Sequence, residues 1–208
     1  MRIRIDLKIL IFLLLFYFTK QINIYLIIMF FSIIHELGHM LTGLIFKLKV
    51  DKLEIMPCGV SVSFKESKNM SIKKIELKKI LIALAGPATS LFLVVLYTYI
   101  NTLYISKQDA VYANLLILLF NLIPLYPLDG GRIIKGILNI EIGYEKSQQL
   151  TNLISNFTMI ILTLFCSIGV YYFKNIAIFL ICIFLWIITI QENNKEKFPE
   201  TLDFKQKV

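Results

Sequence analysis

Six long apolar blocks run through this sequence, and they restrict its fold more than any other feature. Hydrophobic residues make up 57% of the chain, whereas about 45–50% is usual for a soluble domain. Such long apolar blocks are typical of chains that use the bilayer as solvent. They are Leu7–Phe18, Ile22–Phe46, Ile80–Ile100, Ala110–Ile123, Leu150–Phe173 and Ile176–Ile190. We therefore expect an all-α polytopic membrane protein with about six transmembrane helices.

The first block, Leu7–Phe18, is short for a span unless Ile3 and Ile5 extend it. Basic residues precede it, as in a signal peptide, but no small-residue cleavage site follows it, so we expect the helix to be retained. The membrane part is expected to form one domain over residues 1–190. A polar, lysine-rich cytoplasmic tail, too short for a further domain, follows at 191–208.

Lysine and arginine residues are distributed unevenly among the segments between the blocks. With six spans both termini lie on one side, and that side receives 19 of the 22 basic residues. Because basic loops stay in the cytoplasm, we expect a multi-pass protein of the cell membrane with both termini cytoplasmic. The net charge of +8 reflects this topology, with some attraction to anionic lipids of the bilayer, so we expect the lipid bilayer as a partner and no nucleic acid.

A HExxH pattern lies in the second block, where His35 and His39 flank Glu36. Residues four apart share a helix face, so the two histidines can hold one zinc ion, while Glu36 can accept a proton from an attacking water. They are the only histidines of the chain, and Ile22–Phe46 contains no other ionisable residue apart from Tyr25. A charge at mid-membrane costs about 2.5–3.5 kcal/mol, which indicates a functional site. The alternative, histidines bonded to a neighbouring helix, does not account for the glutamate.

A zinc hydrolase needs a third protein ligand, which here must be a carboxylate or a cysteine because no third histidine exists. Asp129 stands out within NLIPLYPLDGGR (121–132). The prolines of this segment interrupt the helix, and the paired glycines permit a tight turn. Alternatively, Asp129 caps a helix that starts near Arg132. The spacing alone does not favour either interpretation, metal ligand or helix cap.

The combination of HELGH in one block with NLIPLYPLDGGR in a later one resembles the site-2 protease family of intramembrane zinc metalloproteases. LEIMPCGVSVSF (53–64) resembles the hairpin that follows the HExxH helix in that family, and LAGPATSLF (84–92) resembles its AGP-containing span. The likeness extends over about residues 22–135. It is closest to the six-span branch that contains the stage IV sporulation protease processing pro-sigma-K.

The resemblance implies a zinc metalloendopeptidase that cuts a membrane-associated protein in or near its transmembrane segment. A sporulation sigma-factor precursor is one candidate substrate. A membrane protein that inhibits the protease is a candidate partner. The implied zinc ligands are His35, His39 and Asp129, with Glu36 as general base; Asn121 and Pro127 match positions near the bound substrate. Ser90 stands where many relatives carry asparagine, and we assign it no role. We also expect no regulatory CBS domain, because the tail is short.

Residues 50–64 alternate between apolar and polar side chains around Pro57-Cys58-Gly59, which indicates a small β-hairpin after the HExxH helix. Its edge could pair with an extended substrate by strand addition, or it could only shield the site. The following MSIKKIELKK (70–79) indicates a short basic amphipathic helix on the membrane surface.

Three rival functions fit parts of the pattern. A CAAX-processing HExxH protease lacks the DGG element, so that element argues against it. A metal-ion transporter would use the His/Asp cluster as a transit site, but transporters often show internal repeats and none is visible. A non-catalytic membrane chaperone is disfavoured because every catalytic position is filled.

Overall fold

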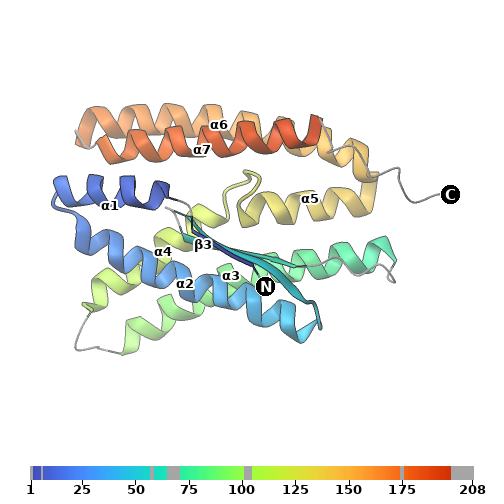
Figure 1. Ribbon diagram of the computed structural model, residues 1–208, viewed down its shortest axis with the longest axis horizontal. Coiled ribbons are helices and arrows are strands. Elements are labelled where there is room, and N and C mark those ends of the chain that lie inside the picture. Colours follow the sequence, from blue (N-terminus) through green and yellow to red (C-terminus); the bar gives the residue numbers. More distant parts are fainter. Residues whose placement is uncertain are drawn as a thin grey trace. The chain divides into compact units, whose positions relative to one another are not determined.

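Seven helices and one three-stranded sheet make up the described residues of the computed structural model (Figure 1). Those residues are 2–5, 7–56, 59–64, 71–100, 105–173 and 176–197. The elements follow in the order β1 (Arg2–Ile5), α1 (Lys8–Phe18), α2 (Ile22–Ile45), β2 (Val50–Met56), β3 (Gly59–Phe64), α3 (Ile72–Tyr99), α4 (Lys107–Asn121), α5 (Asp129–Ile142), α6 (Tyr144–Phe173) and α7 (Ile176–Lys197). This mainly helical architecture confirms the expected fold class.

The expected β-hairpin is confirmed by β2 and β3, which pair in antiparallel fashion with Leu53 opposite Val62. Its turn residues Pro57 and Cys58 lie outside the described residues. Strand β1 adds in parallel to the other side of β2, which gives the strand order β1-β2-β3. Ile3 and Ile5 therefore belong to a strand and do not lengthen the first helix, because RIRI alternates charged and β-branched residues.

Three of the described helices are long and apolar enough to cross a membrane: α2, α3 and α6. Helices α1 and α4, with 11 and 15 residues, are about 16 and 22 Å long at about 1.5 Å per residue. Both are shorter than the hydrocarbon core of about 30 Å. The chain is a multi-pass membrane protein, while the count of six spans stays a prediction.

Helix α3 begins within the lysine-rich segment and continues without a break to Tyr99. The expectation of a separate surface helix at 70–79 was therefore wrong. With 28 residues the helix is about 42 Å long, more than the hydrocarbon core requires. The lysine-rich first turns of α3 extend beyond its apolar part. Because these turns continue into the apolar part as one helix, their backbone C=O groups are paired within the helix.

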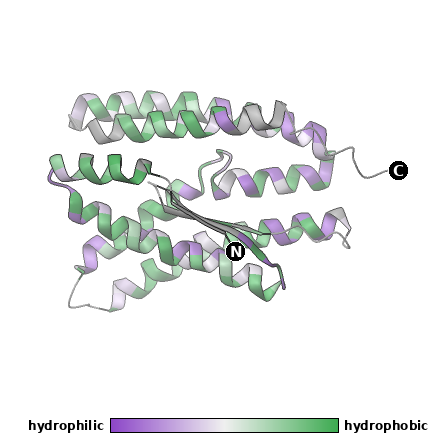
Figure 2. Ribbon diagram, viewed as in Figure 1, coloured by the Kyte–Doolittle hydropathy of each residue, from purple (hydrophilic) through white to green (hydrophobic). Residues whose placement is uncertain are grey.

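Hydrophobic residues predominate along the long helices (Figure 2), and many of their large apolar side chains are exposed. On α3, for example, Leu91 and Phe92 are exposed while the next residue, Leu93, is buried. A large exposed apolar surface is unusual for a soluble protein and suits contact with lipid chains.

The chain divides into two units, Met1–Ile123 and Pro124–Val208, and each is described by itself. In the first unit, α3 packs against both α2 and α4 around a core of Phe31, Leu93, Ala110, Ala113 and Ile117. This core positions the HExxH helix against α3. In the second unit, α6 and α7 lie side by side (Figure 1), and Trp186 Nε1 donates to Thr163 Oγ1 across them at 3.0 Å.

Candidate metal centre

Helix α2 carries the HExxH residues on its buried face. His35, Glu36 and His39 are all buried, with exposed fractions of 4%, 8% and 3%. A continuous helix forms here because the segment is apolar and contains no proline, so positions four apart align along one face. The structure therefore brings the three residues together as the sequence predicts.

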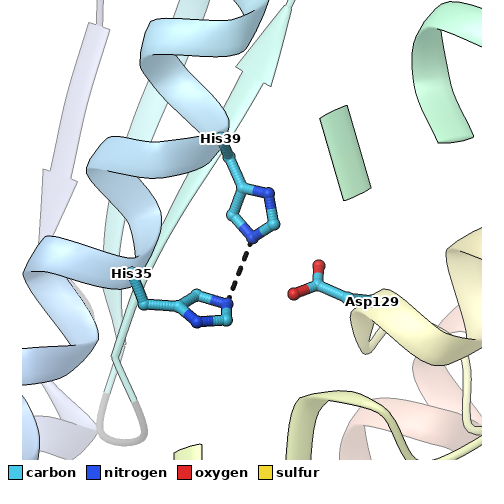
Figure 3. A group of neighbouring side chains, drawn as sticks. All are labelled: His35, His39 and Asp129. Atoms are coloured by element: carbon cyan, nitrogen blue, oxygen red, sulfur yellow. Dashed lines mark hydrogen bonds between the residues drawn. The ribbon is translucent and has the colours of Figure 1, made fainter. Parts of the chain in front are cut away.

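The two imidazole rings point toward each other, with 3.2 Å between the Nε2 atoms of His35 and His39 (Figure 3). Two nitrogens, each about 2.0–2.1 Å from a tetrahedral zinc ion, lie about 3.3–3.4 Å apart. The observed separation is close to that distance. The pair therefore fits two neighbouring positions of a zinc coordination sphere.

The orientation of His39 is determined by the backbone of α3. Its Nδ1 lies 2.6 Å from the carbonyl oxygen of Ile82. The backbone N–H of Gly86 points at the same Nδ1 from 3.3 Å, a longer contact that would need a lone pair on that nitrogen, so one tautomer makes only one of the two hydrogen bonds. A carbonyl oxygen only accepts hydrogen bonds, so the shorter contact requires the proton of the ring on Nδ1. In the neutral ring, Nε2 then carries the lone pair that a metal needs.

Gly86 of α3 leaves the space in front of the two ligand nitrogens open. A Cβ atom added at Gly86 would overlap Nε2 of both His39 and His35. Any larger residue would thus fill the space at the two Nε2 atoms, where a shared metal ion would bind. This role of Gly86 was not predicted from the AGP element, although a glycine inside an otherwise apolar helix was an available signal.

Glu36 lies beside the histidine pair and contacts the hairpin. Its Oε2 is 4.0 Å from His39 Nε2, and its Oε1 accepts a hydrogen bond from the backbone N–H of Val62 in β3. The carboxylate is therefore held next to the candidate metal position by β3, the second strand of the predicted hairpin. Val62 was not predicted to contact the site, because its contact is made by the backbone.

Asp129 is the first residue of α5 in the second unit, and it is buried with an exposed fraction of 4%. The N-cap position is Leu128, without a side-chain cap, so Asp129 is not the cap that the alternative interpretation required. Arg132 Nη1 lies 3.8 Å from Asp129 Oδ1. The carboxylate sits at a helix N-terminus, where the dipole favours negative charge.

The segment before Asp129 is not helical, as its prolines predict, and α6 holds it in place. The backbone N–H of Tyr126 donates to Ser155 Oγ at 3.0 Å, and Thr158 Oγ1 donates to the carbonyl oxygen of Pro124 at 3.2 Å. Gly131 packs so closely on the backbone of this segment that an added Cβ would overlap it. These contacts position the start of α5.

The two residues expected near a substrate are both half-buried. Asn121 ends α4 in the first unit, and its Nδ2 donates to the carbonyl oxygen of Ile117 at 3.0 Å. Pro127 lies in the non-helical segment of the second unit. Their substrate role stays a prediction.

Most of the chain is similar in sequence to known zinc metalloproteases and to the family that contains them. The profile of peptidase family M50 matches residues 23–107 and 107–165. A zinc metalloprotease of Methanocaldococcus jannaschii is 29% identical over 80% of this chain and 48% of its own length. Stage IV sporulation protein FB of Bacillus subtilis is 25% identical over 64% of this chain and 46% of its own length.

A solved structure has the same fold. The site-2 protease from Methanocaldococcus jannaschii superimposes with a TM-score of 0.68 and 25% identity, covering 93% of this chain and 92% of the solved chain. The chain spans about half the length of the curated relatives it matches.

Proposed function

Because the chain belongs to peptidase family M50, we propose that it is an intramembrane zinc metalloendopeptidase that cuts a membrane-associated protein in or near its transmembrane segment. The observation that carries the proposal is the buried pair of imidazoles, with Nε2 atoms 3.2 Å apart in front of Gly86. The comparisons lend no support to metal transport or to a chaperone without activity.

The proposed zinc ligands are Nε2 of His35, Nε2 of His39 and a carboxylate oxygen of Asp129. All three side chains are buried, and each offers one ligand atom (Figure 3). Two neutral imidazoles and one carboxylate form a donor set that zinc takes in hydrolases with one position left for water or substrate. When bound, zinc lowers the pKa of a water molecule and polarises the scissile carbonyl group.

Glu36 is the proposed general base. Its Oε1 is occupied by the Val62 N–H, which fixes the carboxylate, while Oε2 is directed toward the histidine pair at 4.0 Å from His39 Nε2. Oε2 accepts the proton of the attacking water and delivers it to the nitrogen of the leaving amine. The hydrogen bond from the Val62 N–H to Oε1 holds the carboxylate, and with it Oε2, in place during both transfers.

The proposed binding mode for the substrate is strand addition at β3. Strand β1 covers one side of β2, and β3 covers the other, so β3 supplies the sheet edge next to Glu36. Alternate residues of a strand direct their backbone groups to the same side, so Val60 shares the edge with Val62. An extended peptide on this edge would expose its carbonyl groups to the base, which a helical segment would not.

Asn121 and Pro127 are proposed to contact the unwound substrate, because an amide side chain and a proline-interrupted backbone both offer groups to an extended peptide. A sporulation sigma-factor precursor is a candidate substrate through the likeness to stage IV sporulation protein FB. We further propose that a membrane protein binds and inhibits the protease. The distribution of basic residues supports cytoplasmic termini.

The test compares wild type with Glu36→Gln, which keeps the size of the side chain and removes its basicity. Each is coexpressed with a panel of epitope-tagged membrane-anchored proteins, and fragments are detected on gels. We expect fragments with wild type alone and about one zinc per chain in both purified proteins. Cleavage by Glu36→Gln at the wild-type rate would refute the general-base role, and wild-type protein that purifies without zinc would refute the metalloprotease.

A further inference from the structure

Ser90 contacts the second ring nitrogen of His35. Its Oγ lies 2.8 Å from His35 Nδ1, and both residues are buried, with Ser90 at 0% exposure. The residues are 55 positions apart in the chain, so the contact joins α2 to α3. A polar group buried in this apolar surrounding must keep its partner, since an unpaired one costs about 1–3 kcal/mol.

Ser90 belongs to a regular stripe of α3. Ile82, Gly86 and Ser90 follow one another at intervals of four, which places them on one helix face. Ile82 supplies a carbonyl oxygen to His39, Gly86 leaves space at the two Nε2 atoms, and Ser90 supplies a hydroxyl group to His35. The earlier histidine contacts the later serine, so α2 and α3 run in opposite directions here. One face of α3 therefore contacts both histidines and borders the space at their Nε2 atoms.

The two Nδ1 atoms have partners of different chemistry. The carbonyl oxygen of Ile82 accepts only, so it allows a single tautomer of His39. A hydroxyl group accepts and donates, so Ser90 can accept the Nδ1 proton of His35 and leave Nε2 free for a metal. A partner on the far ring nitrogen orients a ligating histidine and raises its basicity.

We propose that Ser90 is a positioning residue for zinc binding: its hydroxyl group accepts the Nδ1 proton of His35 and directs the Nε2 lone pair of this ring toward the metal. The proposal rests on the zinc centre proposed above and extends it to a residue outside the ligand set. Ser90 does not touch substrate or the reacting atoms in this role. Its effect reaches the site only through His35.

The test measures zinc affinity of the full-length, detergent-solubilised protein by competition with a chromophoric chelator. Ser90→Ala removes the hydroxyl group and is expected to weaken zinc binding about 10–100-fold. Ser90→Thr keeps the hydroxyl group and is expected to hold the affinity within about threefold of wild type. The matched control is Ser147→Ala, which removes another fully buried serine hydroxyl, bonded to the carbonyl oxygen of Lys135.

A second readout separates positioning from general support of the fold. The absorption spectrum of the cobalt-substituted protein reports the ligand geometry, and Ser90→Ala should shift its bands while Ser147→Ala leaves them unchanged. Ser90→Ala protein with wild-type zinc affinity and an unchanged cobalt spectrum would overturn the inference. Equal losses of affinity in Ser90→Ala and Ser147→Ala would also overturn it, because the effect would then be structural. Both outcomes leave the proteolytic function standing, which only wild-type protein without zinc or activity would refute.

Discussion

The carboxylate of Glu36 accepts a hydrogen bond from the backbone N–H of Val62, so the HExxH helix and the edge of the hairpin meet at the proposed general base. The contact requires no particular side chain at position 62, only a free N–H. A strand edge normally offers such groups to another strand. Here one of them orients a carboxylate, which places the base and the proposed substrate edge side by side.

Replacing Val62 with proline should lower cleavage without affecting zinc. Proline removes the N–H, while the pairing with β2 is kept because the Val62 N–H points away from β2 toward Glu36. A hydrogen bond to a charged group contributes about 1.5–3 kcal/mol, so we expect a loss of about 10–100-fold in kcat/KM. Val62→Ala is the matched control, since it shortens the side chain and keeps the donor. If both variants lose activity equally, the side chain matters and the backbone contact does not.

Replacing Gly86 with alanine should abolish zinc binding. The added Cβ would overlap the Nε2 atoms of both histidines. Neither ring can move aside without breaking its hydrogen bond at Nδ1. Metal analysis of the purified variant should show less than about one-tenth of the wild-type zinc. The protein should remain folded, since alanine favours the helix.

The control for this variant is Gly43→Ala, the same change at another buried glycine. There the added Cβ meets the far end of the Phe64 ring in the hairpin and no imidazole atom is among its nearest neighbours. Gly43→Ala is expected to keep its zinc, even if the hairpin shifts. Normal zinc content in Gly86→Ala would show that the metal does not lie between the two rings.

The parts of the site that could be predicted from the sequence are those that depend only on residues close together in the chain. HExxH places two histidines on one helix face because the helix period is local, and the proline–glycine segment before Asp129 interrupts a helix for reasons within the same ten residues. The alternation of residues 50–64 indicates two strands for the same reason. These features needed no knowledge of the rest of the chain.

The features that escaped prediction depend on contacts between distant segments. Ser90 and Gly86 acquire their positions only because α3 runs antiparallel to α2, and Val62 acts through its backbone, which every residue has. Strand β1 was missed because its parallel pairing with β2 joins residues 50 positions apart, such as Arg2 and Lys52. The separate surface helix at 70–79 was wrong because amphipathic pattern alone does not tell where a helix ends.

Replacing Asp129 with asparagine should weaken zinc binding at least about tenfold, because an amide oxygen is neutral and a poorer ligand than a carboxylate. Chelator competition on the purified protein measures this directly. Asp109→Asn serves as the control: Asp109 is an exposed carboxylate in the first turn of α4, bonded to Ser106. It should lose a few tenths of a kcal/mol of helix stability at most and no zinc affinity. Full zinc occupancy of Asp129→Asn under chelator competition would remove it from the ligand set.

Replacing Asn121 or Pro127 with alanine should reduce cleavage while zinc content and thermal stability stay near wild type. Asn121 already bonds the carbonyl oxygen of Ile117 one turn earlier through Nδ2, and its amide oxygen is the group offered to a substrate N–H. Asn114 provides the matched control, because it lies two turns earlier on the same helix face and bonds the carbonyl oxygen of Ala110 in the same way, yet is fully buried.

If Asn121 contacts substrate, Asn121→Ala loses activity at unchanged stability, whereas Asn114→Ala loses stability, measured by thermal unfolding, in proportion to any activity lost. If Asn121 serves only the helix, both variants lose stability together and activity follows it. A cysteine placed at 121 or 127 distinguishes the cases further, since only a residue beside the substrate will crosslink to a thiol near the cleavage site. Stable, zinc-loaded and fully active Asn121→Ala protein, with no crosslink from position 121, would refute the proposed contact between Asn121 and the substrate.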